Sequence, residues 1–440
     1  MTWTSTLDVA RPELVGRVRQ AVGLSVEVEG LDLAIGDLVQ LGDGPVGSGT
    51  HVPAEVVAAT VGAARCMPLA PPHGLRAGLE ARATGGSLRV PVGPGLLGRV
   101  LDGLGQPIDG KGPLRDVTYV DIAGRAPHPL ARQRVANPLN LGVRTLDTLT
   151  TVGCGQRIGL FAGSGVGKST LLSMIARGTD AQISVISLVG ERGREVREFL
   201  EDDLGPEGLA RSVVVVATSD QPALVRKRSA FVATRIAEHL RDGGADVVLM
   251  MDSLTRVAMA QREIGLSVGE PPATRGYPPS VFSLLAELLE RAGTGATGSV
   301  TGIYTVLVDG DDHNEPIADQ ARSILDGHVV LDRKLATAGH FPSIDALGSI
   351  SRVASRVTTR EQRADATELR RVMAARRSVQ DLVDVGAYVA GSNPLVDAAL
   401  ASAQEIDAFL QQGVDEEAPA AESWARLHEL VSRFGTREAA

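Results

Sequence analysis

A short run of small residues, hydroxyl side chains and one lysine has the composition and spacing of a phosphate-binding loop. Its glycines let the backbone turn tightly and point N–H groups at phosphate oxygens, and the helix expected after it adds a favourable dipole. Lys168 would supply positive charge to the β- and γ-phosphates, and the Ser169 hydroxyl would ligate Mg²⁺. The loop residues predicted to bind the nucleotide are Gly163, Ser164, Gly165, Val166, Gly167, Lys168, Ser169 and Thr170.

One position departs from the usual form of this loop. The pattern normally opens with glycine five residues before Gly167, where this chain has Ala162. The other glycines, the Gly-Lys-Ser-Thr end and the apolar run before the loop favour functional nucleotide binding over a degenerate loop kept for packing. We therefore predict that ATP and Mg²⁺ bind here.

Two carboxylates follow apolar runs that have the length of buried strands. Asp252 ends the run DVVLMMD, and a carboxylate at a strand tip beside a phosphate loop can hold Mg²⁺ directly or through water. Glu191 follows the run that ends at Val189, at the edge where an open α/β sheet binds its ligands. Hydrolysis needs a group that orients and deprotonates water, so Glu191 is a candidate base. Judged by its position alone, it could equally be a solvated loop residue.

The elements that must position these residues alternate between strand-like runs and helical patterns. Continuous apolar strands separated by helices predict an α/β domain whose parallel sheet is covered on both faces. The expected strands cover residues 157–162, 184–189, 212–217, 246–251 and 303–307, and expected helices cover 169–176 and 223–241.

Two further regions flank this core. Short strands with frequent glycines predict a small β-barrel before it, with strand-like alternation at Val22, Leu24, Val26 and Val28. After about residue 360 the pattern becomes helical and charged, with helices expected over 360–383 and 394–411 and near 424–434. We predict an N-terminal barrel with a leading amphipathic segment (1–90), an ATPase core (91–359) and a C-terminal helical domain (360–440).

Composition excludes some classes of function. The net charge of −9 over 440 residues disfavours a protein whose main task is to hold nucleic acid. Cys66 and Cys154 lie far apart and the eight histidines are scattered, which argues against a metal site built from these residues. The sequence has no N-terminal targeting signal and no apolar run near ~18 residues, so we expect a soluble, cytoplasmic protein.

Several segments resemble the catalytic subunit of rotary ATP synthases and its relatives. They are the phosphate loop, GERGRE, MMDSLTR, ILDGHVVLDRKLA and GSISRV. The resemblance implies a RecA-like core in which Glu191 is the catalytic carboxylate, followed by Arg192 as in the family. It also implies that Lys168 takes part in catalysis and that Arg256, in the segment after Asp252, braces the site.

The same resemblance extends to the adenine and to the neighbouring subunit. Phe341, in AGHFPSID, occupies the place of an aromatic residue that stacks on adenine, and Tyr388 would face the ring from the C-terminal domain. Arg352, in GSISRVASR, matches the segment that supplies an arginine finger. In ATP synthases the base and the finger come from two different subunit types, whereas this chain carries both. We therefore predict a homohexamer with ATP at the subunit interfaces.

Longer stretches at residues 270–293 and 298–333 closely resemble the ATPases of bacterial flagellar protein export and of the type III secretion injectisome. The resemblance covers nearly the whole chain. It implies a ring at the cytoplasmic base of the export apparatus, on the inner membrane, that engages chaperone–cargo complexes and export-gate membrane proteins. It further implies a stator-like regulatory subunit at the N-terminal segment and a coiled-coil stalk in the pore. The run from Glu368 to Pro394 favours the flagellar branch.

Other functions remain open at this stage. The amphipathic stretch at residues 7–18 suits a partner groove or an acidic lipid surface, or packs on its own barrel. An injectisome ATPase and a catalytic subunit of a proton-translocating ATP synthase are the nearest alternatives. A hexameric RNA translocase is disfavoured because Trp3 is the only aromatic residue before Tyr119. A non-catalytic nucleotide-binding subunit is disfavoured by the presence of Glu191.

Overall fold

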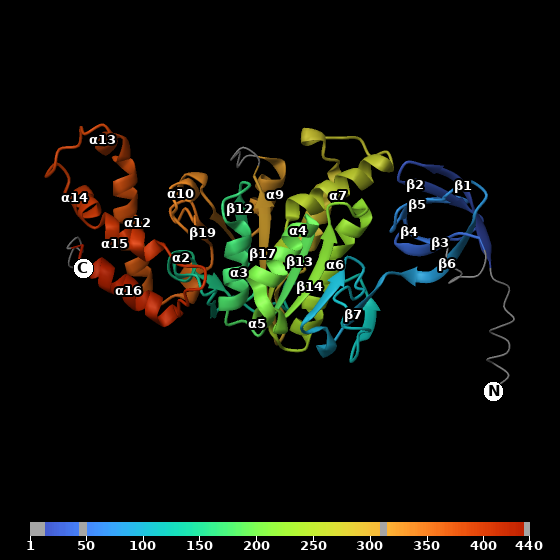
Figure 1. Cartoon of the computed structure of the whole chain (residues 1–440), viewed down its shortest axis with the longest axis horizontal. Helices are drawn as coiled ribbons and strands as arrows, with labels where there is room; N and C mark the ends of the chain where they lie inside the picture. Colours follow the sequence, from blue (N-terminus) through green and yellow to red (C-terminus); the bar gives the residue numbers. More distant parts are fainter. Residues whose placement is uncertain (1–13, 44–50, 309–314, 435–440) are drawn as a thin grey trace.

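The computed structural model describes residues 14–43, 51–308 and 315–434, which form three parts along the long axis of the molecule (Figure 1). A closed six-stranded barrel lies at the N-terminal end, a nine-stranded sheet flanked by helices occupies the middle, and a helical region lies at the other end. The predicted fold class is confirmed. The exact domain boundaries, near residues 90 and 359, stay predictions.

The barrel places small aliphatic side chains inside. Val26 and Val28 are each 1% exposed, as the alternation predicted, but Val22 and Leu24 are exposed and do not belong to the same strand. Gly23, at φ 57°, makes a tight turn between them, so the expected alternation is wrong at its start. The barrel strands are β1 (Val15–Val22), β2 (Ser25–Glu29), β3 (Asp37–Leu41), β4 (Val52–Thr60), β5 (Ala63–Pro68) and β6 (Glu80–Ser87).

The amphipathic stretch predicted at residues 7–18 is described only in part. Residues 1–13 lie outside the described residues. Val15 to Val18 belong to strand β1, which pairs with β2 and β6. This end of the stretch is therefore part of the barrel wall.

The central sheet has the order β19-β18-β12-β17-β15-β13-β14-β8, with β16 paired to β17. All five predicted strands are confirmed, and all neighbours from β18 to β8 are parallel. The strands missed from the sequence are short or lie near the sheet edges. The strands are β8 (Arg99–Asp102), β12 (Arg157–Ala162), β13 (Ile183–Glu191), β14 (Ser212–Thr218), β15 (Asp246–Asp252), β16 (Gly293–Thr294), β17 (Ser299–Leu307), β18 (Gly327–Val330) and β19 (Ile350–Ser351).

Successive side chains of the central strands enter two separate aliphatic cores. In β14, Val213 and Val215 pack in one core, and Val214 and Val216 pack in the other. The first core includes α6 (Ala223–Asp242), α7 (Leu254–Ser267), α8 (Pro279–Glu290) and α9 (Pro316–Ile324). The second includes α2 (Arg144–Leu149), α3 (Lys168–Gly178), α4 (Gly193–Glu198) and the π-helical turn η2 (Phe199–Leu204), with α5 (Gly205–Ala210) and α10 (Arg333–Thr337) packed beside it. The sheet is thus covered on both faces, as predicted.

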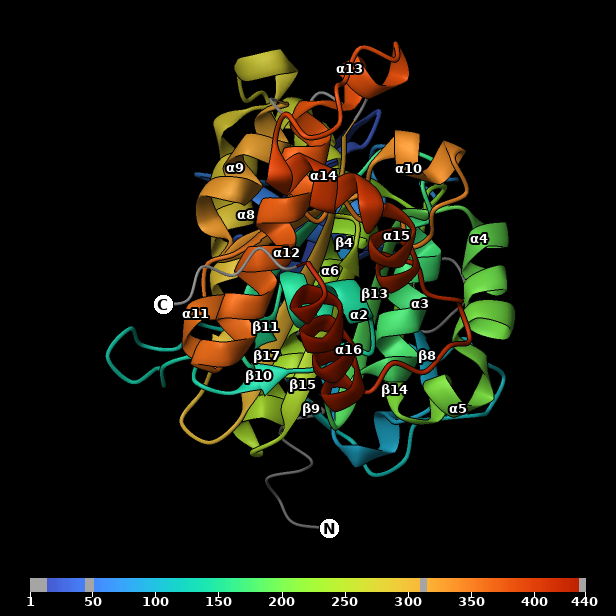
Figure 2. The ribbon, with the colours of Figure 1, turned by 90° about the vertical axis from the view of Figure 1, so that its left-hand side faces the viewer.

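The C-terminal helices pack around Leu369, Val372, Phe409 and Leu427, and Figure 2 shows them from their outer side. The helix predicted over 394–411 is two helices separated at Ser402, and the one predicted over 360–383 divides at Val379. The pattern therefore located helices correctly but missed both breaks. The helices are α11 (Ala354–Val357), α12 (Arg360–Ser378), α13 (Gln380–Asp384), α14 (Pro394–Ala401), α15 (Ala403–Leu410) and α16 (Ala420–Ser432).

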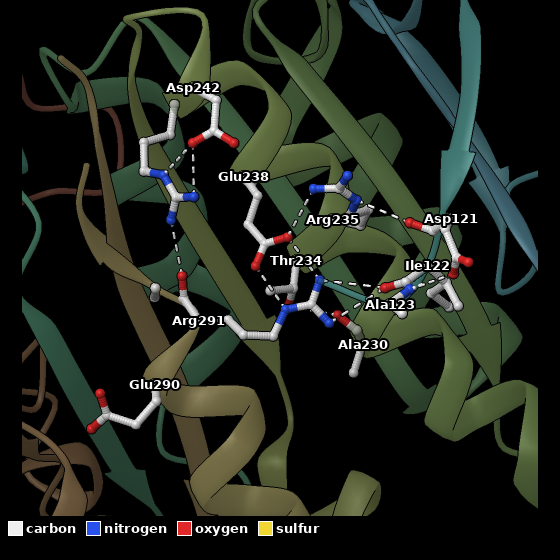
Figure 3. Close-up of polar contacts among 12 residues, drawn as sticks. Asp121, Ile122, Ala123, Ala230, Thr234, Arg235, Glu238, Asp242, Glu290 and Arg291 are labelled. Atoms are coloured by element: carbon white, nitrogen blue, oxygen red, sulfur yellow. Dashed lines mark hydrogen bonds and ion pairs between the residues drawn. The ribbon is translucent and has the colours of Figure 1, made fainter. Parts of the chain in front are cut away.

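A buried ion pair fastens the segment at Ile122, between β8 and β12, to two helices of the core (Figure 3). Arg291, after α8, binds Glu238 of α6 through two hydrogen bonds of 2.7 Å, and each residue is 1% exposed. The guanidinium of Arg291 also donates to the Ile122 carbonyl at 3.5 Å and lies over the Phe231 ring. One buried ion pair therefore holds three separate chain segments together.

We predict that Glu238→Ala lowers the free energy of unfolding by about 3–5 kcal/mol, because it leaves the Arg291 charge buried and unpaired. Urea denaturation followed by circular dichroism measures this change. The matched control is Glu429→Ala, which removes an exposed glutamate that pairs with Arg433 on the surface, and should cost at most about 1 kcal/mol. Equal effects of the two substitutions would contradict the role assigned to the buried pair.

Candidate active site

The phosphate loop lies between β12 and α3, as the sequence predicted. Gly165 and Gly167 have φ values of 75° and 88°, in the left-handed region that favours glycine, and Gly167 caps α3. Ala162, which replaces the usual first glycine, is the last residue of β12 and is 1% exposed. Because its backbone is an ordinary strand, alanine fits there without strain.

Two side chains from the segment between β18 and β19 hold the loop. The Ser343 hydroxyl donates to the Val166 carbonyl at 2.6 Å, and Arg333 donates to the Ser164 carbonyl at 3.1 Å. No local sequence pattern marks either contact, because both join positions about 170 residues apart. These bonds shape the loop without using its N–H groups, which leaves the donors available for phosphate.

Lys168, Asp252 and Glu191 meet beside the loop. The Lys168 ammonium forms an ion pair with the Asp252 carboxylate and lies 3.7 Å from Glu191 Oε1. Thr305 of β17 donates its hydroxyl to Asp252 Oδ1 at 2.7 Å, a contact that the sequence did not suggest. Asp252 is 3% exposed and Glu191 9%. The structure thus brings together the three charged groups that the sequence selected.

Arg256, rather than Arg192, is the arginine nearest Glu191. Arg256 Nε lies 3.7 Å from Glu191 Oε1, and its aliphatic stem crosses Gly190, where an added Cβ would come within 2.6 Å of Arg256 Cδ. The Arg192 side chain is 78% exposed and lies 3.6 Å from Glu195. A catalytic role for Arg192 therefore stays a prediction that this arrangement does not favour.

Burial and the charge of Asp252 together raise the pKa of Glu191 to about 7, although Lys168 and Arg256 oppose the shift. Glu191 Oε1 is buried and makes no hydrogen bond within the described residues. A buried carboxylate oxygen without a donor is costly unless it serves a ligand or a water. The group is therefore suited to exchange a proton near neutral pH.

Phe341 lies against the phosphate loop, whereas Tyr388 forms its hydrogen bonds within the C-terminal helical region. Two Phe341 ring carbons are 3.6 Å from the position that a Cβ on Gly167 would take, and the side chain is 45% exposed. The Tyr388 hydroxyl instead donates to Asp397 Oδ1 at 3.0 Å, within the C-terminal helical region. The nucleotide-binding roles of Phe341 and Tyr388 both stay predictions, and the position of the Phe341 ring against the loop favours the first of them.

Arg352 lies far from the phosphate loop of its own chain. Its N–H donates to the Asp326 carbonyl, and the Asp326 N–H donates to the carbonyl of Arg157, the first residue of β12. The loop follows the last residue of β12, so about 16 Å of strand separates the two levels. The Arg352 side chain thus lies at the opposite end of the strands, where it is exposed and its guanidinium donates to the Arg322 carbonyl at 3.3 Å.

Known protein families and relatives match this chain over most of its length. Residues 142–351 match the nucleotide-binding domain of the ATP synthase alpha/beta family, and residues 358–429 match the C-terminal domain of the type III secretion ATPase EscN. The chain is 51% identical over 417 residues to the flagellum-specific ATP synthase of Bacillus subtilis, covering 94% of this chain and 95% of that protein. It is 49% identical to a type 3 secretion system ATPase of Xanthomonas euvesicatoria, covering 94% and 92%.

The chain belongs to the flagellar and type III secretion ATPases. Its fold matches the assembled EscN of enteropathogenic E. coli with a TM-score of 0.89 at 42% identity, covering 94% of this chain and all of that one. A second EscN structure, in complex with its central stalk EscO, matches with a TM-score of 0.88. This member of the family is an ATPase. Within the described residues, none of its helices is both long and apolar enough to cross a membrane.

The raised pKa of Glu191 makes the stability of the nucleotide-free ATPase depend on pH. The folded-state pKa, about 7, exceeds the ordinary value of 4.5, so the folded state holds a proton that the unfolded state releases. Stability contributed by Glu191 is therefore lost as pH rises from about 4.5 to 7. Glu191→Gln cannot ionise at this position. We predict that its free energy of unfolding, taken relative to wild type, rises by roughly 1–3 kcal/mol as the pH is raised from 5 to 8. Melting curves across this range measure the difference, and a constant difference would contradict the assignment.

Proposed function

We propose that this ATPase hydrolyses Mg-ATP to support flagellar protein export, with Glu191 as the catalytic base. The observation that carries the proposal is the buried Glu191 Oε1, which makes no hydrogen bond within the described residues and lies 3.7 Å from the nitrogens of Lys168 and Arg256. A carboxylate with a pKa of about 7 can accept a proton from water at cellular pH. The positive charge of Lys168 partly balances the negative charges of Glu191 and Asp252.

The residues at the loop fit Mg²⁺ and a triphosphate. Hard oxygen ligands suit this ion, and the Ser169 hydroxyl and the Asp252 carboxylate supply them. Asp252 is buried, accepts from Thr305, and already contacts a cation, the Lys168 ammonium. When bound by these two residues, Mg²⁺ would supply positive charge against the transferring phosphoryl group. Lys168 then binds phosphate oxygens, and Glu191 orients the attacking water and takes its proton, while Arg256 keeps the carboxylate in place.

Phe341 forms a flat apolar wall for the adenine. Its contact with Gly167 supports this role, since the ring lies beside the loop that binds the phosphates. Tyr388 lies between α13 and α14 and donates to Asp397 there, so its position supports an adenine role less directly. We retain it as the weaker half of the proposed adenine site.

Arg352 acts on the active site of a neighbouring copy in a homohexamer. Its place at the opposite end of the strands supports a finger that works between subunits, because it cannot reach its own loop. A guanidinium that stabilises the transferring phosphoryl is worth ~10³–10⁵ in rate. Each copy supplies a base to its own site and an arginine to the next, so a ring of identical chains completes every site.

The ring would stand at the cytoplasmic face of the inner membrane and engage chaperone–cargo complexes and export-gate proteins. The EscN–EscO complex supports a central stalk protein as one partner, and we propose that this stalk is a coiled coil. A stator-like subunit would bind near the N-terminus, with peripheral membrane contact as an additional feature. An injectisome role is the second candidate, since relatives of both branches share nearly equal identity with this chain.

We predict that mixing Arg352→Ala chains with Lys168→Ala chains restores ATPase activity that neither variant has alone. In the mixture, an intact loop on one chain meets an intact finger on the other. Activity at a 1:1 ratio should reach on the order of a quarter of wild type if the chains assemble at random.

The control for this experiment is a mixture of Lys168→Ala with the double variant that lacks both residues. That mixture contains no intact loop and should stay inactive. Full activity of Arg352→Ala alone, or no recovery in the first mixture although rings form, would contradict a finger that acts between subunits.

A further inference from the structure

The segment between α15 and α16 contacts the aromatic wall of the nucleotide site from the C-terminal side. We call residues 411–416 the strap. The Gln412 N–H donates to the Phe341 carbonyl at 3.0 Å, and Gln411 Nε2 lies 3.3 Å from His340 Nδ1. Gln412 is 5% exposed and His340 8%, so both residues are buried in the joint between core and helices.

The Gln412 side chain fixes the conformation of the strap. Its Oε1 accepts from the Arg144 N–H at 2.8 Å, and its Nε2 donates to the carbonyls of Gly142 and Glu416 at 2.8 and 2.9 Å. Arg144 is buried, donates to the Gln411 carbonyl at 2.8 Å and pairs with the Glu416 carboxylate. Every polar atom of the Gln412 amide thus has a partner, and the partners lie on both sides of the joint.

The strap also reaches the helix that begins at the phosphate loop. Arg177, in the last turn of α3, donates to the Val414 carbonyl at 2.9 Å and forms an ion pair with Asp415 at 3.0 Å. At the other end of α3, its N-cap residue Gly167 lies beside the Phe341 ring. The strap therefore contacts both the aromatic wall and the far end of the phosphate helix.

We propose that Gln412 is a positioning residue for the adenine side of the site. It acts through the strap, whose N–H holds the Phe341 backbone while the ring rests on the loop. Phosphate binding uses the loop N–H groups and Lys168, which make no contact with Gln412. Gln412 therefore affects the affinity of the site for adenine and leaves its affinity for the phosphates unchanged. This inference rests on the proposed adenine role of Phe341.

The test compares two ligands by isothermal titration calorimetry on the full chain with Mg²⁺ present. One ligand is a non-hydrolysable ATP analogue, and the other is inorganic tripolyphosphate, which has no base. We predict that Gln412→Ala raises the Kd for the analogue about fivefold to tenfold and changes the Kd for tripolyphosphate less than about twofold. Phe341→Ala should weaken the analogue about tenfold or more, with the same selectivity.

Combining the substitutions tests whether Gln412 acts through Phe341. The double variant should bind the analogue no more weakly than Phe341→Ala, because the wall that Gln412 positions is already gone. A purely structural effect of Gln412→Ala would instead weaken both ligands and add to the Phe341 effect, which would overturn the inference. If Phe341→Ala itself leaves analogue binding unchanged, the proposed adenine wall is wrong, and the inference falls with it.

Two further variants keep the test decisive. Gln261→Ala is the matched control, since it removes a similarly buried glutamine, 7% exposed, whose amide donates to Ser280 between α7 and α8. It should leave the ratio of the two Kd values unchanged. If Gln412→Ala does not fold, the exposed Gln411→Ala removes only the contact with His340. It should weaken the analogue about twofold to threefold without affecting tripolyphosphate, and an unchanged ratio would overturn the inference.

Discussion

The active site depends on one cation placed between two buried carboxylates. Asp252 and Glu191 lie at the carboxyl ends of strands in one parallel sheet, and Lys168 follows the end of a third strand. Two ionised acids so close together repel each other, and the ammonium makes their burial possible. The strand order brings the ends together, and the left-handed glycines of the loop bring Lys168 to them. The same repulsion and burial that raise the pKa of Glu191 suit it to accept a proton.

Paired charges also join the three parts of the molecule. Arg228 of α6 binds Glu55 of the barrel, and the glutamate side chain is 4% exposed. At the other end, Arg144 holds the strap that follows α15. Within the core, the pair of Arg291 and Glu238 joins the end of α8 and α6 to the segment at Ile122. A chain with only 3% aromatic residues has aliphatic cores, which are non-directional, whereas these ion pairs have defined geometry and fix how each part meets the next.

Local sequence patterns predicted the central sheet and the charged residues of the site, because the signal for each is contained in a short stretch of sequence. Apolar runs marked the central strands, and each catalytic candidate lay within a few residues of a run or a glycine loop. Contacts between distant segments left no local signal. Three such contacts form only when the chain folds. They are the hydrogen bond from Thr305 to Asp252, the packing of Arg256 against Gly190, and the hydrogen bond from the Gln412 N–H to the Phe341 carbonyl. The breaks at Ser402 and Val379 were missed because helical periodicity continues through both positions.

In the proposed function, Glu191 is a base for ATP hydrolysis that nucleotide binding does not need. The most direct measurement compares nucleotide affinity and turnover of the assembled Glu191→Gln ATPase with wild type. We predict an ATP Kd within about threefold of wild type and a kcat lower by ~10²–10⁴, since the amide can fill the space but cannot take a proton. A variant that binds ATP equally well and keeps a kcat within about tenfold of wild type would contradict the assignment.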